Sequence, residues 1–294
     1  MTLRLRFHET GADRVAFGCS PAHEALRSLQ VLADVKHHPL HISWALRTRR
    51  RMSPALKAEA EMFAFCYRQR PLLFRGIWPH IDVWDWTDEL SALRQAPVAE
   101  YAEMLIMGAL MRRTLGSRIP LELFLQSPEL QQEALTQVEA RHPVSLPVIR
   151  ELIAHPEHSR QRFADLLADY WEACIAPEWP RIEALLQHDI ARRGRALHRR
   201  GLLEMLEELS PDVRVNRESG EVVIRRQGGI RDADPIDLAL AEHDELLLAP
   251  SYFVWPRLTA LVQQVVEEGE ERAAVLVVYP LLEMQDEGAG PGAS

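Results

Sequence analysis

The spacing of apolar residues changes once along this chain, and that change constrains the fold more than any other feature. For about two hundred residues apolar side chains recur three or four positions apart, the spacing that places them on one face of an α-helix. The clearest stripe consists of Phe163, Leu166, Leu167, Tyr170, Trp171 and Cys174. After Ser210-Pro211 the apolar residues alternate with polar ones, as in half-buried β-strands. We therefore expect an α+β protein.

Serine-proline pairs predict where three of the helices begin. The pairs are Ser20-Pro21, Ser53-Pro54 and Ser127-Pro128. In each pair the serine hydroxyl can accept a hydrogen bond from the first helical turn, and the proline removes a donor that the helix cannot use. Asp85 or Thr87 is expected to cap a further helix. A similar helix between these is predicted from the spacing of Tyr101, Met104, Leu105 and Ala109.

The segment VRVNRESGEVVIRR predicts a β-hairpin near the start of the C-terminal part. Val213 and Val215 would lie on the same face as Val222 and Ile224 of the second strand. Gly220 can adopt the positive φ that a short hairpin loop requires.

Other segments also have the character of strands. Leu246, Leu247 and Leu248 form one apolar run, and AAVLVVYP at 273–280 forms another. SYFVW lies between Pro250 and Pro256, and its β-branched and aromatic residues predict a short strand or an extended arm. At the other end of the chain LRLRF alternates from residue 3 and is expected to join the C-terminal strands.

The predicted architecture is a large, mainly helical body with a small, mostly antiparallel C-terminal sheet joined by the N-terminal strand. The body with its N-terminal strand would occupy residues 1–209, and the β-rich subdomain packed on it would occupy residues 210–282. Residues 283–294 are rich in glycine and polar residues, which predicts a disordered tail.

Composition limits the cellular setting. The chain has 294 residues and a net charge of -9, which opposes non-specific binding of the whole molecule to nucleic acid or anionic membranes. Its 3 cysteines are far apart, which argues against a disulfide framework. The N-terminus lacks a signal-peptide pattern and no segment approaches ~18 consecutive apolar residues, so we expect a cytoplasmic protein without membrane partners. Among 34 basic residues only Lys36 and Lys57 are lysine, a bias typical of GC-rich bacterial genomes.

The residues that could carry chemistry do not form a known catalytic motif. His37, His38 and His41 are close in sequence, but Pro39 lies between them, so a solvated helix entry is favoured over a metal site. Cys19 and His23 lack a third orienting residue, which favours a buried cysteine over a nucleophile. We therefore predict that the protein is not an enzyme and has no catalytic residue, no metal ligand and no cofactor.

The segment WPHIDVWDW at 78–86 combines indole rings with carboxylates. The candidate ligand-binding residues are Trp78, Trp84 and Trp86, together with Trp255 from SYFVW. With Asp82 and Asp85 they could line a pocket for a cationic or planar ligand. The commoner role of such a segment is to anchor a loop in the core, because indole rings bury a large area.

Arginine residues gather in three places. The candidate residues for binding nucleic acid or an acidic partner are Arg192, Arg193, Arg195, Arg199 and Arg200. The alternative for this group is the solvated face of a helix whose apolar side runs from Ile182 to Ile190. The other groups are Arg47, Arg49, Arg50 and Arg51 near a helix end and Arg225, Arg226 and Arg231 around a pair of glycines.

Five segments in order resemble a known group of proteins. They are LRLRFH, PAHEALRSLQVL, RRGRALHRRGLLEMLEELSPDVRV, LLLAPSYFVWPR and VLVVYP. The chain is similar, from residue 3 to about 280, to the N-terminal, functionally uncharacterised region of ArsR-like transcriptional regulators from high-GC Gram-positive bacteria. The likeness rests on pattern and order, so it concerns fold and lineage rather than chemistry.

The resemblance implies a role in transcription regulation. In those regulators a winged helix-turn-helix follows the strand that ends in Tyr-Pro and binds DNA, whereas LLEMQDEGAGPGAS follows Pro280 here. We therefore expect the sensing or dimerising module of an ArsR-like regulator, without an evident DNA-reading domain. The implied partners are a second copy in a homodimer, a small-molecule effector, and DNA through a local basic patch or a partner protein.

Two alternatives stay open at this point. The first is a non-catalytic interaction or accessory module that acts with a DNA-binding partner. The second is an enzyme of an unrecognised type that uses the tryptophan and carboxylate residues of 78–86.

Overall fold

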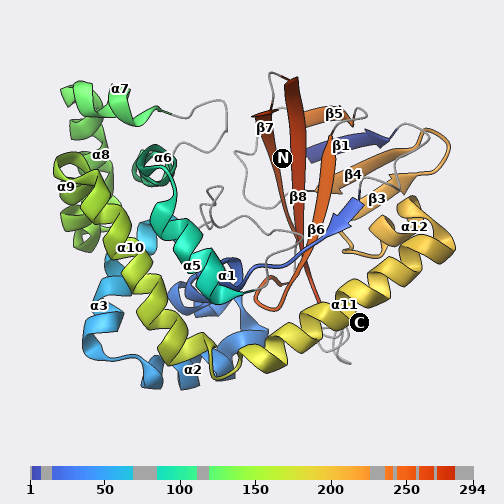
Figure 1. Ribbon diagram of the computed structural model, residues 1–294, viewed down its shortest axis with the longest axis horizontal. Coiled ribbons are helices and arrows are strands. Elements are labelled where there is room, and N and C mark those ends of the chain that lie inside the picture. Colours follow the sequence, from blue (N-terminus) through green and yellow to red (C-terminus); the bar gives the residue numbers. More distant parts are fainter. Residues whose placement is uncertain are drawn as a thin grey trace. The chain divides into compact units, whose positions relative to one another are not determined.

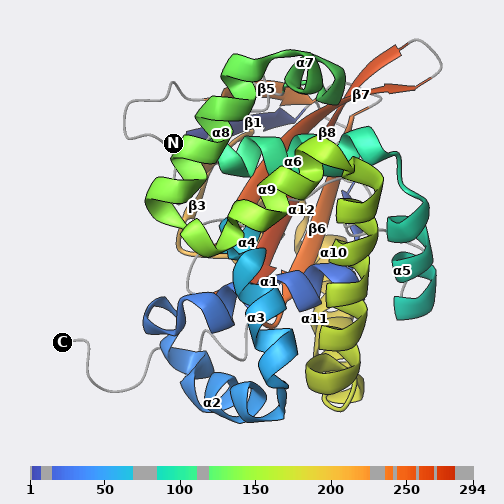
Figure 2. The same cartoon turned by 90° about the vertical axis from the view of Figure 1, so that its left-hand side faces the viewer.

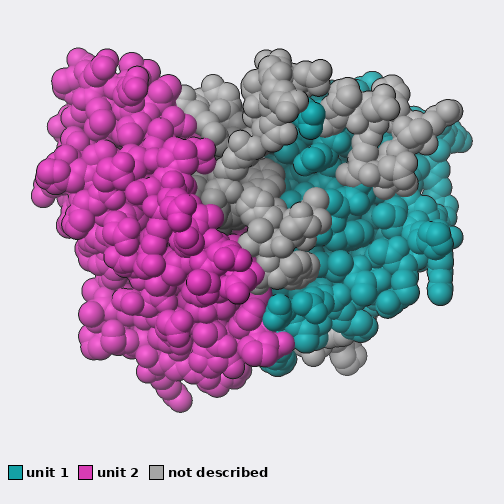
Figure 3. All heavy atoms as spheres, in the orientation of Figure 1, with its two compact units in different colours: residues 1–19, 79–82, 181–294 teal, residues 20–78, 83–180 magenta. Residues whose placement is uncertain are grey.

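The structure of the protein, a computed structural model, describes residues 2–7, 15–68, 85–110, 119–225, 236–240, 244–255, 258–267 and 270–281. The chain divides into two compact units (Figure 3). One unit draws its described residues from Met1–Cys19 and Arg181–Ser294 and contains the strands of the described chain; we call it the β unit. The other draws them from Ser20–Trp78 and Val83–Pro180 and is helical; we call it the helical unit. The predicted α+β class is confirmed.

The helical unit is an assembly of short and medium helices. They are α1 (Pro21–Ala33), α2 (Ile42–Arg51), α3 (Pro54–Met62), α4 (Ala64–Tyr67), α5 (Trp86–Gln95), α6 (Val98–Ala109), α7 (Leu121–Gln126), α8 (Pro128–Arg141), α9 (Leu146–Ala154) and α10 (Pro156–Tyr170). Short 3-10 turns are η2 (Val35–His37), η3 (Pro39–His41) and η6 (Pro143–Ser145), and a π-helical turn, η7 (Trp171–Ile175), follows α10. Figures 1 and 2 show α10 passing α5, α6 and α9, which it contacts.

The predicted helix starts are confirmed by side-chain caps. Ser20, Ser53 and Ser127 each accept a hydrogen bond from a backbone N–H of the first turn. The donors are His23, Leu56 and Leu130, at 2.9, 3.1 and 3.2 Å. Asp85 caps α5 in the same way, because its Oδ1 accepts from the N–H of Thr87 at 2.6 Å. These caps satisfy donors that have no partner inside the helix.

The core of the helical unit contains the long apolar stripe. Every member of the stripe is buried, from Phe163 to Cys174, although its last two residues lie in the π-turn rather than in α10. The ring of Phe163 packs 5.3 Å from that of Phe63 and 5.7 Å from that of Tyr101. The stripe of α6 is buried as predicted, so α6 and α10 supply two sides of one core.

The β unit contains two four-stranded sheets and two helices. The strands are β1 (Thr2–Phe7), β2 (Val15–Phe17), β3 (Val213–Asn216), β4 (Glu221–Arg225), β5 (Ile236–Leu240), β6 (Glu245–Ser251), β7 (Thr259–Glu267) and β8 (Glu270–Pro280). One sheet has the order β3-β4-β1-β5 and the other has the order β2-β6-β8-β7. Most of α11 (Trp179–Arg200) and all of α12 (Leu202–Glu207) belong to this unit, and Figure 1 shows α12 beside β3.

Both sheets are mixed, which corrects the prediction of a mostly antiparallel sheet. In the first sheet β1 is antiparallel to β4 and parallel to β5. In the second, β6 is parallel to both β2 and β8, and β7 is antiparallel to β8. The predicted return of the N-terminal strand is confirmed, since β1 lies between β4 and β5. The direction of pairing was wrong because period-2 alternation reports which face is buried and carries no information about the neighbouring strand's direction.

The predicted hairpin is confirmed. Val213 lies opposite Ile224 and Val215 opposite Val222 in the antiparallel pair of β3 and β4. Gly220 has a φ of 65°, which a residue with a side chain rarely adopts. These pairings are local, so short-range pattern and turn chemistry suffice to specify them.

Of the two alternatives predicted for SYFVW, a short strand or an extended arm, the strand does not form beyond Ser251. Strand β6 ends at Ser251, and Tyr252 to Trp255 follow it without strand pairing. Pro250 is inside the strand, opposite Tyr279 of β8 and beyond Leu248, where the pairing with β2 ends. Pro250 has no N–H to donate to a ladder, and it is the second-last residue of β6. The segment is nevertheless anchored, since Phe253 and Val254 are buried.

A single apolar core joins the two sheets to the short helix of the β unit. Leu3 and Leu5 of β1 are buried with Met205 and Leu206 of α12 and with Val277 of β8. The division between the units falls near residue 180, whereas the sequence predicted it at 209/210, because the end of α11 and α12 pack with the strands that follow them. Within the described residues no helix is long and apolar enough to cross a membrane.

Candidate functional site

The tryptophan candidates are distributed over the chain. Trp78 and Trp84 lie outside the described residues, as does Asp82. Trp255 is partly buried in the β unit. Trp86, the first residue of α5, is partly exposed and belongs to the helical unit. Trp86 is thus the candidate whose surroundings can be described in detail.

Trp86 forms an aromatic cluster with two tryptophans that were not predicted as ligand-binding residues. Its ring stacks on that of Trp171, with centroids 4.4 Å apart and planes 7° from parallel. The ring of Trp171 also packs against Trp179 at 5.2 Å and 56°. We call these residues the Trp86 cluster. Trp171 was assigned to the apolar stripe from its helical spacing, which could not reveal that its ring also meets an indole more than eighty positions away.

The π-turn places Trp171 in this cluster. In η7 the N–H of Ala176 donates to the carbonyl of Trp171 at 2.8 Å, one residue further along than in an α-helix. Pro177 and Pro180 follow, and neither has the N–H that would continue a regular helix. Turns of this kind are rare and occur often at functional sites.

Glu89 lies one turn after Trp86 on α5 and is buried. Its Oε2 accepts hydrogen bonds from the hydroxyl of Ser20 at 2.9 Å and from the N–H of Ala22 at 2.7 Å, so it joins α5 to the start of α1. No hydrogen bond from the described residues reaches Oε1. Burial raises the pKa of Glu89 to about 7, against the two hydrogen bonds, which lower it, and with a smaller increase from the charge of Asp85. A protonation change near neutral pH can therefore alter this link.

Helix α1 buries further ionisable side chains. The Nε of Arg27 donates to Nε2 of His23 at 3.1 Å, and Nδ1 of His23 lies 3.8 Å from Oε1 of Glu24. Burial, aided by the charge of Arg27, lowers the pKa of His23 well below its usual value. The ring is therefore neutral, with its proton on Nδ1 facing Glu24, because Nε2 acts as an acceptor. The sequence analysis did not predict the cluster of His23, Glu24 and Arg27. Helix α1 is buried on nearly every side, so these polar residues do not form a separate polar face in the sequence pattern.

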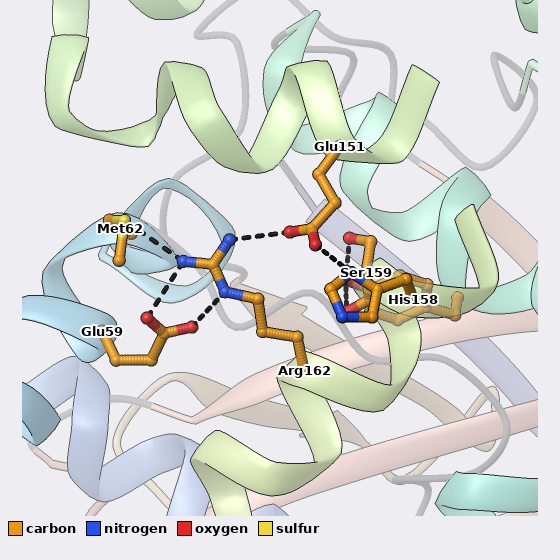
Figure 4. Close-up of polar contacts among 7 residues, drawn as sticks. Glu59, Met62, Glu151, His158, Ser159 and Arg162 are labelled. Atoms are coloured by element: carbon orange, nitrogen blue, oxygen red, sulfur yellow. Dashed lines mark hydrogen bonds and ion pairs between the residues drawn. The ribbon is translucent and has the colours of Figure 1, made fainter. Parts of the chain in front are cut away.

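Arg162 is the centre of a polar network in the helical unit (Figure 4). Its Nε and Nη2 donate to the two carboxylate oxygens of Glu59 at 2.5 and 3.0 Å, and its Nη1 donates to Glu151 at 2.7 Å. Nη2 also contacts the sulfur of Met62 at 3.3 Å. The hydrogen bonds that Arg162 donates to Glu59 raise the pKa of Arg162 further above its usual value. Every nitrogen of the guanidinium is used, so the network ties α3, α9 and α10 together rather than offering a free donor to a ligand.

Neighbouring polar residues extend the network. His158 forms an ion pair with the other oxygen of Glu151, and its ring lies next to that carboxylate in Figure 4. The hydroxyl of Tyr101 is hydrogen-bonded to the carbonyl and hydroxyl oxygens of Ser159 at 2.9 and 2.8 Å. Burial raises the pKa of Tyr101 well above its usual value, so it stays protonated. These contacts hold the first turns of α10 in place.

The arginine candidates of α11 separate into three kinds. Arg193 is buried, with Asp189 and Glu208 at 3.7 and 3.8 Å and its guanidinium 5.5 Å from the ring centre of Tyr279. It is therefore unavailable to an outside partner. Arg200 is exposed and forms an ion pair with Glu208. The remaining candidates, all exposed, are Arg192, Arg195 and Arg199.

The other arginine groups have mixed surroundings. Arg49 donates to the carbonyl of Leu32 at 2.5 Å, and Arg51 forms an ion pair with Glu178 at 2.8 Å. Arg225 is exposed at the end of β4, whereas Arg226 and Arg231 lie outside the described residues. These groups therefore do not form one continuous basic surface within either unit as described.

The histidine and cysteine candidates are not arranged for chemistry. His37 pairs with Asp34 at 2.7 Å, and burial lowers the pKa of His41 to about 4. Cys19, Cys66 and Cys174 are buried free thiols, and burial raises the pKa of Cys174 to about 11, which keeps it protonated at neutral pH. In the part of the chain that the structure describes, no three histidine, cysteine, aspartate or glutamate residues come together as a metal site would need.

Comparisons with known proteins identify a family without a known activity. Residues 1–280 match the profile of the family described as "Family of unknown function (DUF5937)". No curated protein matches the chain, and no solved structure does. The matched residues include both units, from the N-terminal strand to the end of β8. The chain belongs to the DUF5937 family.

Proposed function

We propose that this protein is the sensing and dimerising module of an ArsR-like transcriptional regulator and acts in the bacterial cytoplasm. The resemblance of its ordered segments to the N-terminal region of such regulators supports this role. DNA reading would be the task of a winged helix, in the same polypeptide or on a partner chain. The effector would bind at the Trp86 cluster in the helical unit.

The observation that supports an effector site here is the stacking of the Trp86 ring on the Trp171 ring. Trp86 is one helical turn before Glu89 on α5. Trp86 and Trp179 are partly exposed, so the cluster presents indole surface to solvent. Indole faces attract planar and cationic groups, and the Glu89 carboxylate favours the cation at pH values above about 7, where it is charged. The effector class proposed here is therefore a planar organic cation.

Calorimetric titration with acriflavine, a planar aromatic cation, tests the effector site. We expect acriflavine to bind and the Trp86→Ala variant to bind it about tenfold more weakly, because a desolvated cation–π contact contributes about 1–2 kcal/mol. Uncharged acridone should bind more weakly than acriflavine, since the carboxylate attracts only the cation.

The matched control is Trp255→Ala, which removes the candidate tryptophan of the β unit. It should leave acriflavine affinity unchanged. If wild type and folded Trp86→Ala protein bound acriflavine with equal affinity, the Trp86 cluster would not be the effector site.

A reporter assay tests the regulator role. The full chain is fused to a DNA-binding domain that occupies its operator only as a dimer, and repression of a reporter is measured against the DNA-binding domain alone. We expect the fusion to repress and the purified chain to sediment as a dimer. A monomer that fails to repress would contradict the dimerising role and would favour an accessory module that acts with a different partner.

A further inference from the structure

Helix α11 has one strongly basic exposed side. Its exposed residues are Pro180, Arg181, Ala184, Gln187, His188, Ala191, Arg192, Arg195, His198, Arg199 and Arg200. Arg192, Arg195 and Arg199 are three and four positions apart, so they lie on one side of the helix. We call these three residues the α11 stripe. A different side of the helix is buried through Ile182, Leu186, Asp189, Arg193 and Ala196, which fixes the direction in which the stripe faces.

The charge of the α11 stripe is not neutralised locally. Arg200 is paired with Glu208, and Arg217 contacts Glu204 and Glu207 at 3.7 and 3.2 Å. By contrast, no ion pair or hydrogen bond from the described residues joins Arg195 or Arg199 to a carboxylate. Arg192 is close enough to Glu208 to help lower its pKa, but it forms no ion pair with it. Three cationic groups therefore face solvent on a chain whose net charge is -9.

The chemistry of this surface favours a polyanion over a protein partner. Protein interfaces depend on a few buried aromatic or large apolar anchors. Apart from Pro180 in its first turn, the exposed residues of α11 include no apolar side chain larger than alanine. Arginine, in contrast, can donate two parallel hydrogen bonds to phosphate oxygens. Contacts of basic side chains with the phosphate backbone supply most of the non-specific affinity of proteins for nucleic acid.

The length of the α11 stripe suits a phosphodiester backbone. Seven residues of helix separate Arg192 from Arg199, a rise of about 10 Å at ~1.5 Å per residue. Successive phosphates of one DNA strand advance about 3.4 Å along the axis, so the stripe can meet about three of them. We propose that the α11 stripe binds the phosphate backbone of duplex nucleic acid without reading its sequence. This binding lies in the β unit and does not rest on the proposed effector site.

Fluorescence anisotropy with a labelled random-sequence DNA duplex, measured across salt concentrations, tests the proposal. Three phosphate contacts predict a slope of about -2.7 for log affinity against log salt, so affinity should fall about 40-fold between 50 and 200 mM salt. The variant Arg192→Gln/Arg195→Gln/Arg199→Gln should lose most of the affinity at 50 mM salt and show a slope near zero. Duplex RNA of the same length should bind similarly if phosphate is the group recognised, and discrimination against it would contradict a contact made to phosphate alone.

The control variant Arg47→Gln/Arg50→Gln/Arg150→Gln changes net charge by the same amount at three exposed arginines of the helical unit. It should keep both affinity and slope. An equal loss in the two variants, absence of binding at 25 mM salt, or binding of poly-glutamate as tight as that of DNA would overturn the proposal.

Two further measurements keep the result interpretable. If the glutamine variant fails to fold, the variant Arg192→Lys/Arg195→Lys/Arg199→Lys takes its place, because it keeps the three charges. It should retain the salt slope with reduced affinity for DNA. A slope near zero in the folded lysine variant would contradict the proposal. Acriflavine affinity should be unchanged in the α11 stripe variants, so failure of the effector site and failure of nucleic-acid binding remain distinguishable.

Discussion

Arginine residues of this protein differ in what they can bind because their neighbours differ. Arg162 uses all its nitrogens on Glu59, Glu151 and a sulfur, and Arg193 is buried over the ring of Tyr279. Arg199 is one turn and a half further along α11 than Arg193 and is exposed. Helix geometry separates the two roles, since positions six apart point to different sides of the helix. The residue type is the same, and the surroundings decide whether it stabilises the fold or remains available.

Glu89 illustrates how burial competes with hydrogen bonding at a single side chain. Two donors at 2.9 and 2.7 Å favour the charged form, while loss of water disfavours it, and burial wins. The pKa is therefore about 7 in the folded protein, against 4.5 for an ordinary glutamate. The folded state binds a proton more tightly than the unfolded state over this interval.

This difference predicts a pH dependence of stability. Protonated Glu89 stabilises the folded state fully below pH ~4.5, where the side chain is protonated in both the folded and the unfolded protein. This stabilisation is lost as the pH rises to about 7, because above that value Glu89 is charged in the folded protein as well. Each pKa unit corresponds to about 1.4 kcal/mol, so the loss is on the order of 3 kcal/mol. Urea unfolding between pH 5.5 and 8 should show a smaller decline for Glu89→Gln than for wild type.

The comparison between the two proteins isolates Glu89 from other titrating groups. Buried neutral histidines such as His23 and His41 have lowered pKa values and destabilise the fold at acid pH in both proteins equally. Glu122→Gln, at an exposed position of α7, should keep the wild-type profile. Parallel profiles for wild type and Glu89→Gln would show that Glu89 does not carry the pH dependence.

Among the elements, α11 combines contrasting properties along one helix. It begins after the π-turn and Pro177, has Pro180 in its first turn, buries Asp189 and Arg193 on one side, and exposes the α11 stripe on a different side. Gly194 lies in its interior, where glycine costs about 0.5–1 kcal/mol relative to alanine. Nothing lies within 4 Å of the place where a Cβ would stand. Packing within the chain therefore does not require glycine at this position.

We expect Gly194→Ala to stabilise the protein by about 0.5–1 kcal/mol, because alanine loses less backbone freedom on folding and meets no neighbour here. The free energy of unfolding in urea measures the effect.

Gly201 provides the matched contrast. It ends α11 with a φ of 87°, a left-handed conformation that alanine adopts only with strain. Gly201→Ala should therefore destabilise the protein by about 1 kcal/mol, although no neighbour lies within 4 Å there either. If both alanines changed stability in the same direction, backbone conformation would not be the cause.

At the scale of the whole molecule, the two ends of the sequence meet inside the β unit. Strand β1 pairs with β4 and β5, and Arg4 lies 3.5 Å from Asp237. Strand β2 pairs with β6, which pairs in turn with β8. All of the helical unit lies between Cys19 and Arg181 in sequence. Because such pairings close very long loops, we expect the sheets to form late in folding.

Local features were predictable because their causes lie within a few residues. Caps at Ser20, Ser53 and Ser127 and the hairpin around Gly220 follow from hydrogen bonds and backbone preferences over one turn. The buried stripe ending at Cys174 follows from helical spacing. For the candidate sites, sequence identified Trp86 and the arginines of α11, since both residue types are conspicuous in composition.

The remaining features depend on partners that are distant in the chain. Strands β2, β5 and β7 were not predicted, because their short apolar runs become strands only where a neighbouring strand supplies hydrogen bonds. Trp171 meets Trp86, and Glu89 meets Ser20, through the packing of separate helices.

The order of residues thus specified where the helices begin, which faces are apolar and where the hairpin turns, since those properties arise from local dihedral preferences and side-chain spacing. Folding in three dimensions settled the direction of the strands and the protonation of Glu89. It also determined which arginines of α11 are buried and which face solvent. The physical reason is that burial and charge pairing are properties of a neighbourhood, and most neighbours here come from elsewhere in the chain.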